Sequence, residues 1–246
     1  TNRLVCYMTN WSRFRPGPGK FIPEDIDPNL CTHIIYAYAV VSNKNIVAKF
    51  PEEESKPWEH GFRRIFSENA VRFLRDRGFD GLEVFWAYPS AKTSAYLKEL
   101  LQALRNAFDE DAIASNQARL ILTTALTANA ERIHNDYGEN LVSMEYIAHT
   151  YTILGVPRHM INIGIPTYGV SFQLRNPKDY GLGAPVSGAG PAGKYTGVNG
   201  MLAYYEVCLF IRNGAKKLYA PSQKVPYAFK DYEWVGFEDP TSVRVK

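Results

Sequence analysis

The sequence predicts an α/β protein, and three observations support this fold class. Up to residue 166, apolar runs rich in Val, Ile, Leu and Tyr alternate with segments of helical period, which is typical of parallel strands covered by helices. Each predicted helix closely precedes a predicted strand. From residue 168 onward the amino-acid composition changes, because Gly and Pro become frequent, as in GLGAPVSGAGPAGKYTGVNG. A different kind of structural unit is therefore expected there.

The expected elements follow in a regular order. Short apolar runs bounded by polar or turn residues predict strands, and these cover residues 4–8, 33–41, 81–88, 119–125 and 160–166. Apolar residues spaced three and four apart predict helices, and these cover residues 62–77, 95–108 and 144–154. In the first helix the apolar face consists of Ile65, Phe66, Val71, Phe73 and Leu74.

Residues 170–235 are expected to form a small α+β domain. They hold one helical segment, 200–213, and three β-like runs, KKLYA, KVPYAFK and YEWVGFE. The main α/β domain would then consist of residues 1–169 and 236–246, with the smaller domain inserted into it.

Composition and charge exclude several classes of function. The 246 residues, 46% of them hydrophobic, are enough for one sizeable core or a core plus a small second domain. A net charge of +3 from 28 basic and 25 acidic residues, without a Lys/Arg run, indicates no nucleic acid partner and no membrane surface. No apolar run reaches the roughly 18 residues of a membrane span. The five His and three Cys lack metal-ligand spacing, so neither a metal nor a cofactor is predicted.

The cysteines and the first residues bear on the compartment. Two of Cys6, Cys31 and Cys208 could pair. A bridge between Cys6 and Cys31 would tie the first strand to the start of the second and suits a secreted protein, while buried free thiols are the alternative. Asn10 opens an Asn-Trp-Ser sequon and is a glycosylation candidate. The chain begins TNRLVCYM, without an initiator Met, as a processed mature protein would. Secretion is therefore predicted.

The stretch FDGLEVFWAYP is similar to the signature F-D-G-L-D-x-D-W-E-Y-P, which marks the fourth strand of family 18 glycoside hydrolases, the chitinases. LVCYMTNWSRFRPGPGKFIPEDIDPNLCTHIIYAYA resembles that family's opening strands, INIGIPTYGVSF its seventh strand, and GAPVSGAGPAGKYT, MLAYYEVC and VPYAF its inserted domain. The resemblance covers most of the chain and implies a (β/α)8 TIM barrel with an inserted α+β domain.

Departures from the signature imply that catalysis is lost. In the family the last acid protonates the glycosidic oxygen and the preceding Asp orients the substrate's N-acetyl group for attack. These positions are Ala87 and Phe85 here. The next acidic position of the signature, two residues before Phe85, is Glu83, and Asp80 is the one acid that matches unchanged. At about 3.3 Å per residue, Glu83 would lie roughly 13 Å below Ala87 along a strand, whereas proton transfer needs roughly 3 Å. We expect no useful hydrolysis.

Binding can outlast catalysis, because sugars are held by aromatic faces and hydrogen bonds. Tyr7, Trp11, Tyr38 and Tyr168 match positions where the family lines its groove with aromatic side chains, while an Arg common in the family is Val170 here. Packing in the core is the alternative for these rings. The resemblance thus implies a lectin for chitooligosaccharides or other glycans that contain N-acetylglucosamine.

Two rival functions stay open. A structural, matrix or signalling protein would keep the fold but use its surface for protein partners or assembly instead of the groove. An active chitinase is the other rival, with Glu83 as its acid.

Three barrel strands are missing from the expected pattern. The third would fall between residues 50 and 58, where the sequence reads PEEESKP, and the sixth before Met144, where AERIHNDYGENLVS contains no apolar run. The sequence stops before any eighth strand, and the usual family partner of Cys208 lies in that segment. Either the intact protein has segments that this sequence lacks, or it is a shortened relative that completes itself by association. The intact mass decides between them.

Overall fold

The structure is a computed structural model that describes residues 3–27, 29–42, 45–48, 64–87, 94–126 and 144–246. It divides into two compact units. The first unit comprises Thr1–Asn10 and Pro28–Ile147, and the second comprises Trp11–Asp27 and Ala148–Lys246. The second unit therefore contains residues 11–27, 148–169 and 236–246 in addition to the predicted insertion. The boundaries at residues 170 and 235 stay a prediction.

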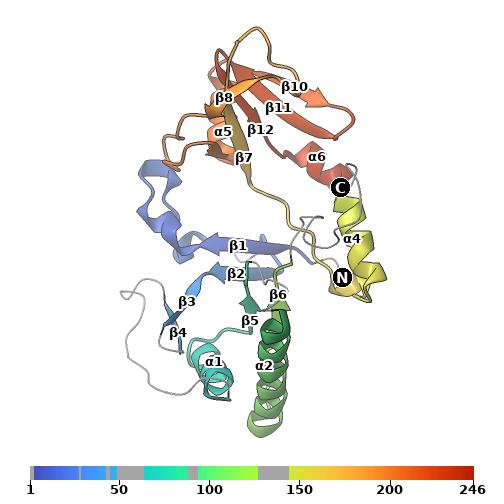
Figure 1. Ribbon diagram of the computed structural model, residues 1–246. Helices are drawn as coiled ribbons and strands as arrows, with labels where there is room; N and C mark the ends of the chain where they lie inside the picture. Colours follow the sequence, from blue (N-terminus) through green and yellow to red (C-terminus); the bar gives the residue numbers. More distant parts are fainter. Residues whose placement is uncertain (1–2, 28, 43–44, 49–63, 88–93, 127–143) are drawn as a thin grey trace. The chain divides into compact units, whose positions relative to one another are not determined.

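The strands of the first unit pair in three sets (Figure 1). Two sets are parallel, as in a βα-type fold, and one is an antiparallel hairpin. The parallel sets are β1 (Val5–Thr9) with β2 (His33–Ala37) and β5 (Gly81–Val84) with β6 (Ile121–Thr124), and the hairpin is β3 (Ala39–Ser42) with β4 (Asn45–Ala48).

The predicted strands are partly wrong in extent. Residues 33–41 form two strands that are interrupted at Tyr38, and β5 ends at Val84 instead of continuing towards residue 88, which lies outside the described residues. The predicted strand 160–166 is not a strand: a 3₁₀ turn, Arg158–Met160, leads into residues that pair with no described strand. A strand needs a partner for its backbone groups. The places expected for the third and sixth strands, within 49–63 and 127–143, also lie outside the described residues.

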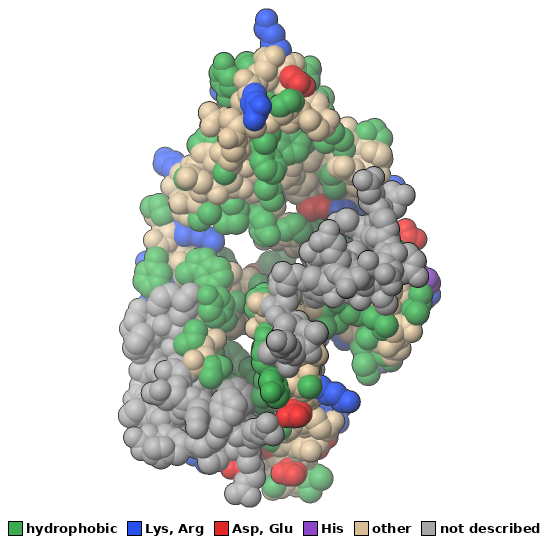
Figure 2. Space-filling view, in the orientation of Figure 1, with side chains coloured by type: hydrophobic (Ala, Val, Ile, Leu, Met, Phe, Trp, Pro, Cys, Tyr) green, Lys and Arg blue, Asp and Glu red, His purple; other side chains and the backbone are tan. Residues whose placement is uncertain are grey.

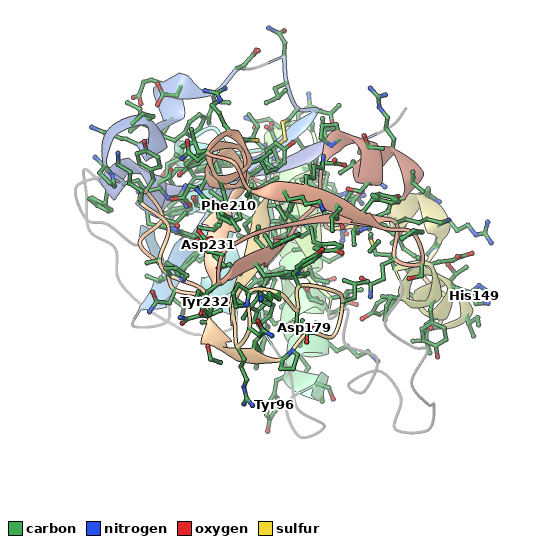
Figure 3. The ribbon with its side chains drawn as sticks, turned by 90° about the horizontal axis from the view of Figure 1, so that it is seen from above. Tyr96, His149, Asp179, Phe210, Asp231 and Tyr232 are labelled. Carbon is green, nitrogen blue, oxygen red and sulfur yellow. A yellow bond between two sulfur atoms is a disulfide. The ribbon has the colours of Figure 1, made fainter. Side chains whose placement is uncertain are left out.

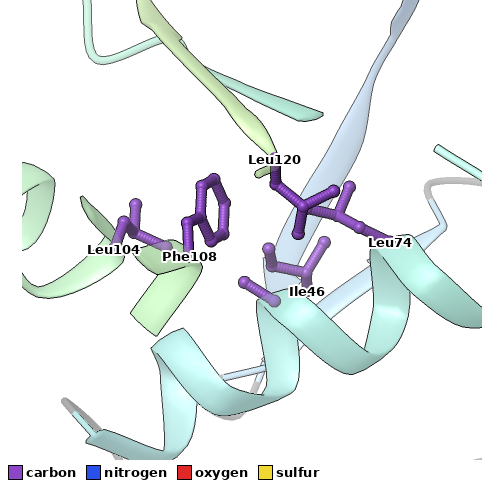
Figure 4. Close-up of a cluster of buried hydrophobic side chains, with 6 residues drawn as sticks. Ile46, Leu74, Leu104, Phe108 and Leu120 are labelled. Carbon is purple, nitrogen blue, oxygen red and sulfur yellow. The ribbon is translucent and has the colours of Figure 1, made fainter. Parts of the chain in front are cut away.

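The helices of the first unit occur where the sequence predicts them. They are α1 (Arg64–Asp76), α2 (Ser94–Ser115), which continues beyond the predicted end at Phe108, and α4 (Met144–Ile153), which crosses the boundary between the units. Between α1, α2, β4 and β6 lies a buried apolar cluster (Figure 4): Ile46, Ala70, Leu74, Leu104, Phe108 and Leu120. An ion pair of 2.6 Å between Arg75 and Asp111 joins α1 to α2.

Gly81, in the FDGLEVFWAYP segment, allows β5 to approach β6 closely. A Cβ atom at this position would overlap the backbone carbonyl oxygen of Ile121, its partner in the parallel register. Only a residue without a side chain fits there. The strand pair that carries Glu83 thus depends on this glycine.

The second unit is built on a six-stranded antiparallel sheet with the order β10-β11-β12-β7-β8, and β9 also pairs with β7 (Figure 1). The strands are β7 (Tyr168–Leu174), β8 (Val186–Ala189), β9 (Met201–Ala203), β10 (Lys216–Ala220), β11 (Val225–Lys230) and β12 (Glu233–Gly236). Helix α5 (Tyr204–Arg212) and a short C-terminal helix, α6 (Pro240–Val245), complete the unit.

Helix α5 packs on the sheet through an apolar cluster that includes Leu202, Val207, Ala228, Val235 and Phe237. Aromatic rings gather around Trp234, whose side chain follows the opposite alternation to Val235 along β12. The Trp234 ring lies 6.0 Å from that of Phe172 and 5.4 Å from that of Tyr227. The strand alternation thus separates a helix-covered face from an aromatic face.

The charged surface is mixed. In the face shown in Figure 2, the Lys and Arg side chains of the described residues are scattered among acidic and hydrophobic ones instead of forming one patch. Within the described ranges no helix is long and apolar enough to cross a bilayer. The same residues contain no group of three His, Cys, Asp or Glu that would suit a metal ion.

Candidate functional site

Glu83 lies on β5 and is held by the neighbouring strands of the first unit. The Tyr7 hydroxyl on β1 donates to both carboxylate oxygens of Glu83, at 2.7 Å and 2.9 Å. The Thr123 hydroxyl on β6 lies 3.5 Å from Oε2. Burial, reinforced by the hydrogen bond to Glu83 and by its negative charge, raises the pKa of Tyr7 above the ordinary value for a phenol. Tyr7 therefore stays protonated as a donor, and Glu83 is a paired carboxylate.

The positions after Glu83 offer no acid. β5 ends at Val84, so the strand predicted over residues 81–88 does not extend to Phe85 and Ala87. Phe85 is 70% exposed, and Ala87 is exposed as well. Asp80, the one acidic position of the signature that is unchanged, is exposed just before β5, and its backbone carbonyl accepts a hydrogen bond from the backbone N–H of Ile121. Within this described segment, Glu83 is thus the carboxylate nearest to the altered positions in sequence.

The four predicted sugar-binding aromatic residues all expose their side chains. Tyr7 is 56% exposed and Tyr38 45%, both in the first unit, while Trp11 is 38% exposed and Tyr168 46%, both in the second. None of the four is fully buried, and their contact with a sugar stays a prediction. Their assembly into one groove stays a prediction.

Local structure presents three of these rings outside regular strand interiors. Trp11 lies in a 3₁₀ helix, Asn10–Phe14, directly after β1. Tyr38 lies between β2 and β3, joined to Ala37 by a cis peptide bond. Tyr168 is the first residue of β7, and Val170, which replaces the family's Arg, is exposed two residues later. Positions at the ends of strands and in the segments that connect them leave a ring accessible to a ligand.

Asn10 is packed in a way that argues against the predicted glycosylation. Its side chain is 1% exposed, and its amide nitrogen donates to the carbonyl oxygen of Tyr38 at 3.2 Å. A glycan on that nitrogen would not fit in the buried space around it. The sequon pattern describes three residues and carries no information about burial.

We therefore expect no glycan at Asn10. Treatment of the protein, expressed through a eukaryotic secretory pathway, with peptide N-glycosidase should leave the mass of the tryptic peptide that contains Asn10 unchanged, and Asn10→Gln should not alter gel mobility. Conversion of Asn10 to Asp by the treatment, detected from the mass of this peptide, would contradict the expectation.

The cysteines agree with one of the two alternatives. Cys6 and Cys31 form a disulfide, with Cα atoms 6.1 Å apart, which ties β1 to the chain just before β2. Cys208 on α5 is free and exposed in the second unit. The predicted bridge is confirmed, and it fits an extracellular protein.

Sequence reasoning missed Thr123, the third partner in the Glu83 cluster. The parallel register places Thr123 directly opposite Glu83. A hydroxyl on the neighbouring strand could have been found only by aligning β5 with β6, and their separation along the chain hides that alignment.

Comparison with known proteins shows the family to which the chain belongs. The chain belongs to the glycosyl hydrolases family 18, since residues 56–246 match the family model. The predicted fold class is confirmed at the level of fold, because the solved structures that the chain resembles are barrel chitinases and chitinase-like proteins, although the barrel is incomplete within the described residues.

Among individual proteins, the chain is similar to chitinase-3-like protein 2 of Homo sapiens, with 33% identity over 320 residues, covering 99% of the chain and 82% of the relative. It is also 33% identical to oviduct-specific glycoprotein of Mus musculus, covering 99% of the chain and 44% of that relative. A solved structure of human YKL-39, described as a pseudo-chitinase with retained chitooligosaccharide binding properties, matches with a TM-score of 0.89 and 31% identity, covering 100% of the chain and 88% of that structure.

The first of these alignments spans 320 residues, more than the 246 of the chain. The relative therefore has segments without a counterpart in this sequence.

Proposed function

We propose that this protein is a non-catalytic, chitinase-like lectin that binds chitooligosaccharides or other glycans containing N-acetylglucosamine. Membership of family 18 and the similarity to a described pseudo-chitinase that binds chitooligosaccharides support the proposal. The chain also resembles solved chitinases, such as the group II chitinase of Ostrinia furnacalis.

The observation that carries the proposal is the state of Glu83. Its two oxygens accept from the Tyr7 hydroxyl at 2.7 Å and 2.9 Å. The carboxylate that β5 retains in the described segment therefore already has a hydrogen-bond donor. Phe85 and Ala87, where the family has its orienting Asp and its acid, carry no ionisable group. Proton transfer to a glycosidic oxygen needs a donor at roughly 3 Å. These residues support a protein without hydrolytic activity.

Sugar binding is supported by the exposed rings. Trp11 presents the largest aromatic face of the four and is 38% exposed, and an indole face packs well against the apolar side of a pyranose. Tyr7 already uses its hydroxyl on Glu83, so in this proposal it contributes its ring and holds Glu83 in place. Val170 cannot supply the hydrogen bonds of the family's Arg, so weaker binding than in a relative with that Arg is expected.

The compartment belongs to the same proposal. The Cys6–Cys31 disulfide forms and persists under oxidising conditions. Together with the similarity to oviduct-specific glycoproteins, it supports a secreted, extracellular protein.

Titration calorimetry with chitotetraose tests the lectin function. We expect saturable heat for the unaltered protein and about tenfold weaker binding for Trp11→Ala, the loss expected for one aromatic contact. Tyr96→Ala is the matched control, because Tyr96 on α2 is an exposed ring, 56% accessible, that belongs to no proposed site. It should bind as the unaltered protein does.

Absence of heat at millimolar chitotetraose, with both variants folded, would overturn the lectin proposal. A structural or signalling protein that uses its surface for protein partners would then be the better account.

A further inference from the structure

A hollow lies wholly within the second unit, on residues that the proposed function does not use. It has a volume of about 710 Å³, within the roughly 300–1,000 Å³ typical of small-molecule sites. Its walls come from the C-terminal end of α5, the turn between β11 and β12, and the loop after β8. Figure 3 labels three of its residues: Phe210, Asp231 and Tyr232.

Amide side chains from three different elements line this hollow. They are Gln173 on β7, Asn199 before β9 and Asn213 after α5. In the part of the chain that the structure describes, none of these three amide groups hydrogen-bonds another side chain or the backbone. Each amide offers both donors and an acceptor, so the hollow presents unused hydrogen-bonding groups of both kinds.

Glu233 adds a carboxyl group to the same hollow. It is the first residue of β12 and is half-buried, and burial raises its pKa above the ordinary carboxyl value. No described residue forms an ion pair or a side-chain hydrogen bond with it. Its neighbour across the ladder is Gln173, so a ligand that reaches one of these two groups meets the other.

The formal charges around the hollow nearly balance. Lys230 is the one cation of the lining, and its ammonium donates to the carbonyl oxygen of Asn213 at 2.9 Å. Asp231 and Glu233 are the acids. A strongly anionic ligand would meet two carboxyl groups, and a strongly cationic one would meet Lys230, so the lining favours an uncharged polar ligand.

The aromatic part of the lining is held by a tight turn. β11 ends at Lys230 and β12 begins at Glu233, and these two residues pair across the hairpin. Asp231 adopts a left-handed backbone conformation, with φ 51°, as short hairpin turns require. The carbonyl of Tyr232 accepts from the backbone of Leu174 at 2.7 Å, and the Tyr232 side chain is 53% exposed. The ring is thus presented from an anchored backbone.

We propose that this hollow is a second carbohydrate site, which takes a neutral sugar ring with its apolar face on Tyr232 and its hydroxyls on Gln173, Asn213 and Glu233. An uncharged ligand with one apolar face and many hydroxyls is the chemical class that fits a lining of amides, one carboxyl group and an aromatic ring. The proposal does not rest on the lectin function, because the two sites share no residue.

Side-chain amide NMR of the full chain tests the site. With millimolar N-acetylglucosamine, glucose or galactose as probes, we expect saturable shifts of the NH₂ signals of Gln173, Asn199 and Asn213 for at least one sugar. Tyr232→Ala should weaken that binding about tenfold, and Glu233→Gln should weaken it less, since it keeps the shape and one acceptor. Tyr219→Ala, which removes an exposed ring on β10 outside the hollow, is the matched control and should have no effect.

The outcomes separate this site from the proposed groove. Shifts that survive Trp11→Ala but not Tyr232→Ala support the second site, whatever calorimetry shows for Trp11. If an arginine-containing peptide shifts these NH₂ signals and none of the sugars does, the carbohydrate assignment is overturned in favour of a cationic partner. No shift with any sugar at millimolar concentration, while the thermal unfolding temperature of the protein is normal, would overturn the site itself.

Discussion

Chitin oligomers should remain intact in the presence of the purified protein, and restoring both missing acids by F85D together with A87E should raise turnover by about 10²- to 10⁴-fold. The reason is chemical: a family 18 mechanism needs a carboxylic acid near the glycosidic oxygen and a second carboxylate to orient the N-acetyl group, and the described end of β5 supplies only Glu83. Release of labelled products from a fluorogenic chitobioside measures the change.

The matched control is F85D with A87Q, which has nearly the same shape but cannot donate a proton. It should remain inactive, while chitotetraose binding shows that each variant is folded. Turnover by the unaltered protein that Glu83→Gln abolishes would show that Glu83 acts as an acid and that the protein is an enzyme.

Replacing Glu206 with Ala should lower the free energy of unfolding of the second unit by about 3–5 kcal/mol. Glu206 on α5 is 6% exposed and accepts four hydrogen bonds, from the backbone of Tyr195 (2.7 Å), Thr196 (3.1 Å) and Ala203 (2.9 Å) and from the Thr196 hydroxyl (2.8 Å). A Cβ at Gly193 would lie 2.5 Å from its Oε1, so the carboxylate fills this space. Alanine removes the acceptor of three part-buried backbone N–H groups and leaves the Thr196 hydroxyl only its 3.4 Å contact with the carbonyl oxygen of Met201.

Urea unfolding, followed by tryptophan fluorescence, measures this loss. Asp179→Ala is the control: Asp179 is an exposed carboxylate in the same unit (Figure 3), and its removal should change stability by less than about 0.5 kcal/mol. Equal stability of the Glu206 and Asp179 variants would contradict a structural role for the Glu206 carboxylate.

The same carboxylate makes stability depend on pH. Burial alone raises the pKa of Glu206, but the hydrogen bonds from Tyr195, Ala203 and Thr196 outweigh it and leave the pKa below the ordinary value of 4.5. Because the pKa is lower in the folded state than in the unfolded state, the contribution is complete above about pH 4.5 and is lost as pH falls through the folded pKa. The difference in the free energy of unfolding between the unaltered protein and Glu206→Gln should therefore shrink below pH 4.5. A difference that stays the same at low pH would contradict this role of the Glu206 carboxylate.

Parts of this fold could be predicted because their signals are local. The run KKLYA coincides with β10, and the periodicity of residues 62–77 produced α1 with Ala70 and Leu74 in the core. Residues 160–166 look like a strand for the same local reason, yet no described strand pairs with them. Pairing depends on residues far away in the chain, which a local pattern does not represent.

Some features of the candidate site can likewise be predicted from the sequence, whereas others depend on the tertiary structure. The absence of acids at Phe85 and Ala87, and the pairing of Cys6 with Cys31 as one of two alternatives, can be stated from residue identity alone. That Tyr7 occupies Glu83 is a tertiary fact, since 76 positions separate them in the chain. The burial of Asn10 is another, because its partner is a backbone carbonyl 28 residues away.

The order of residues thus establishes the fold class, the family resemblance and the missing catalytic groups, since each is carried by periodicity or by the identity of single residues. Folding alone decides which polar groups find partners and which stay unused. Glu83 and Glu206 are ordinary glutamates in the sequence, but one is held by Tyr7 and the other by four donors. The hollow beside Tyr232 likewise exists only because β7, α5 and the β11–β12 turn meet there. Burial and hydrogen bonding are properties of neighbours in space, and these neighbours are distant in the chain.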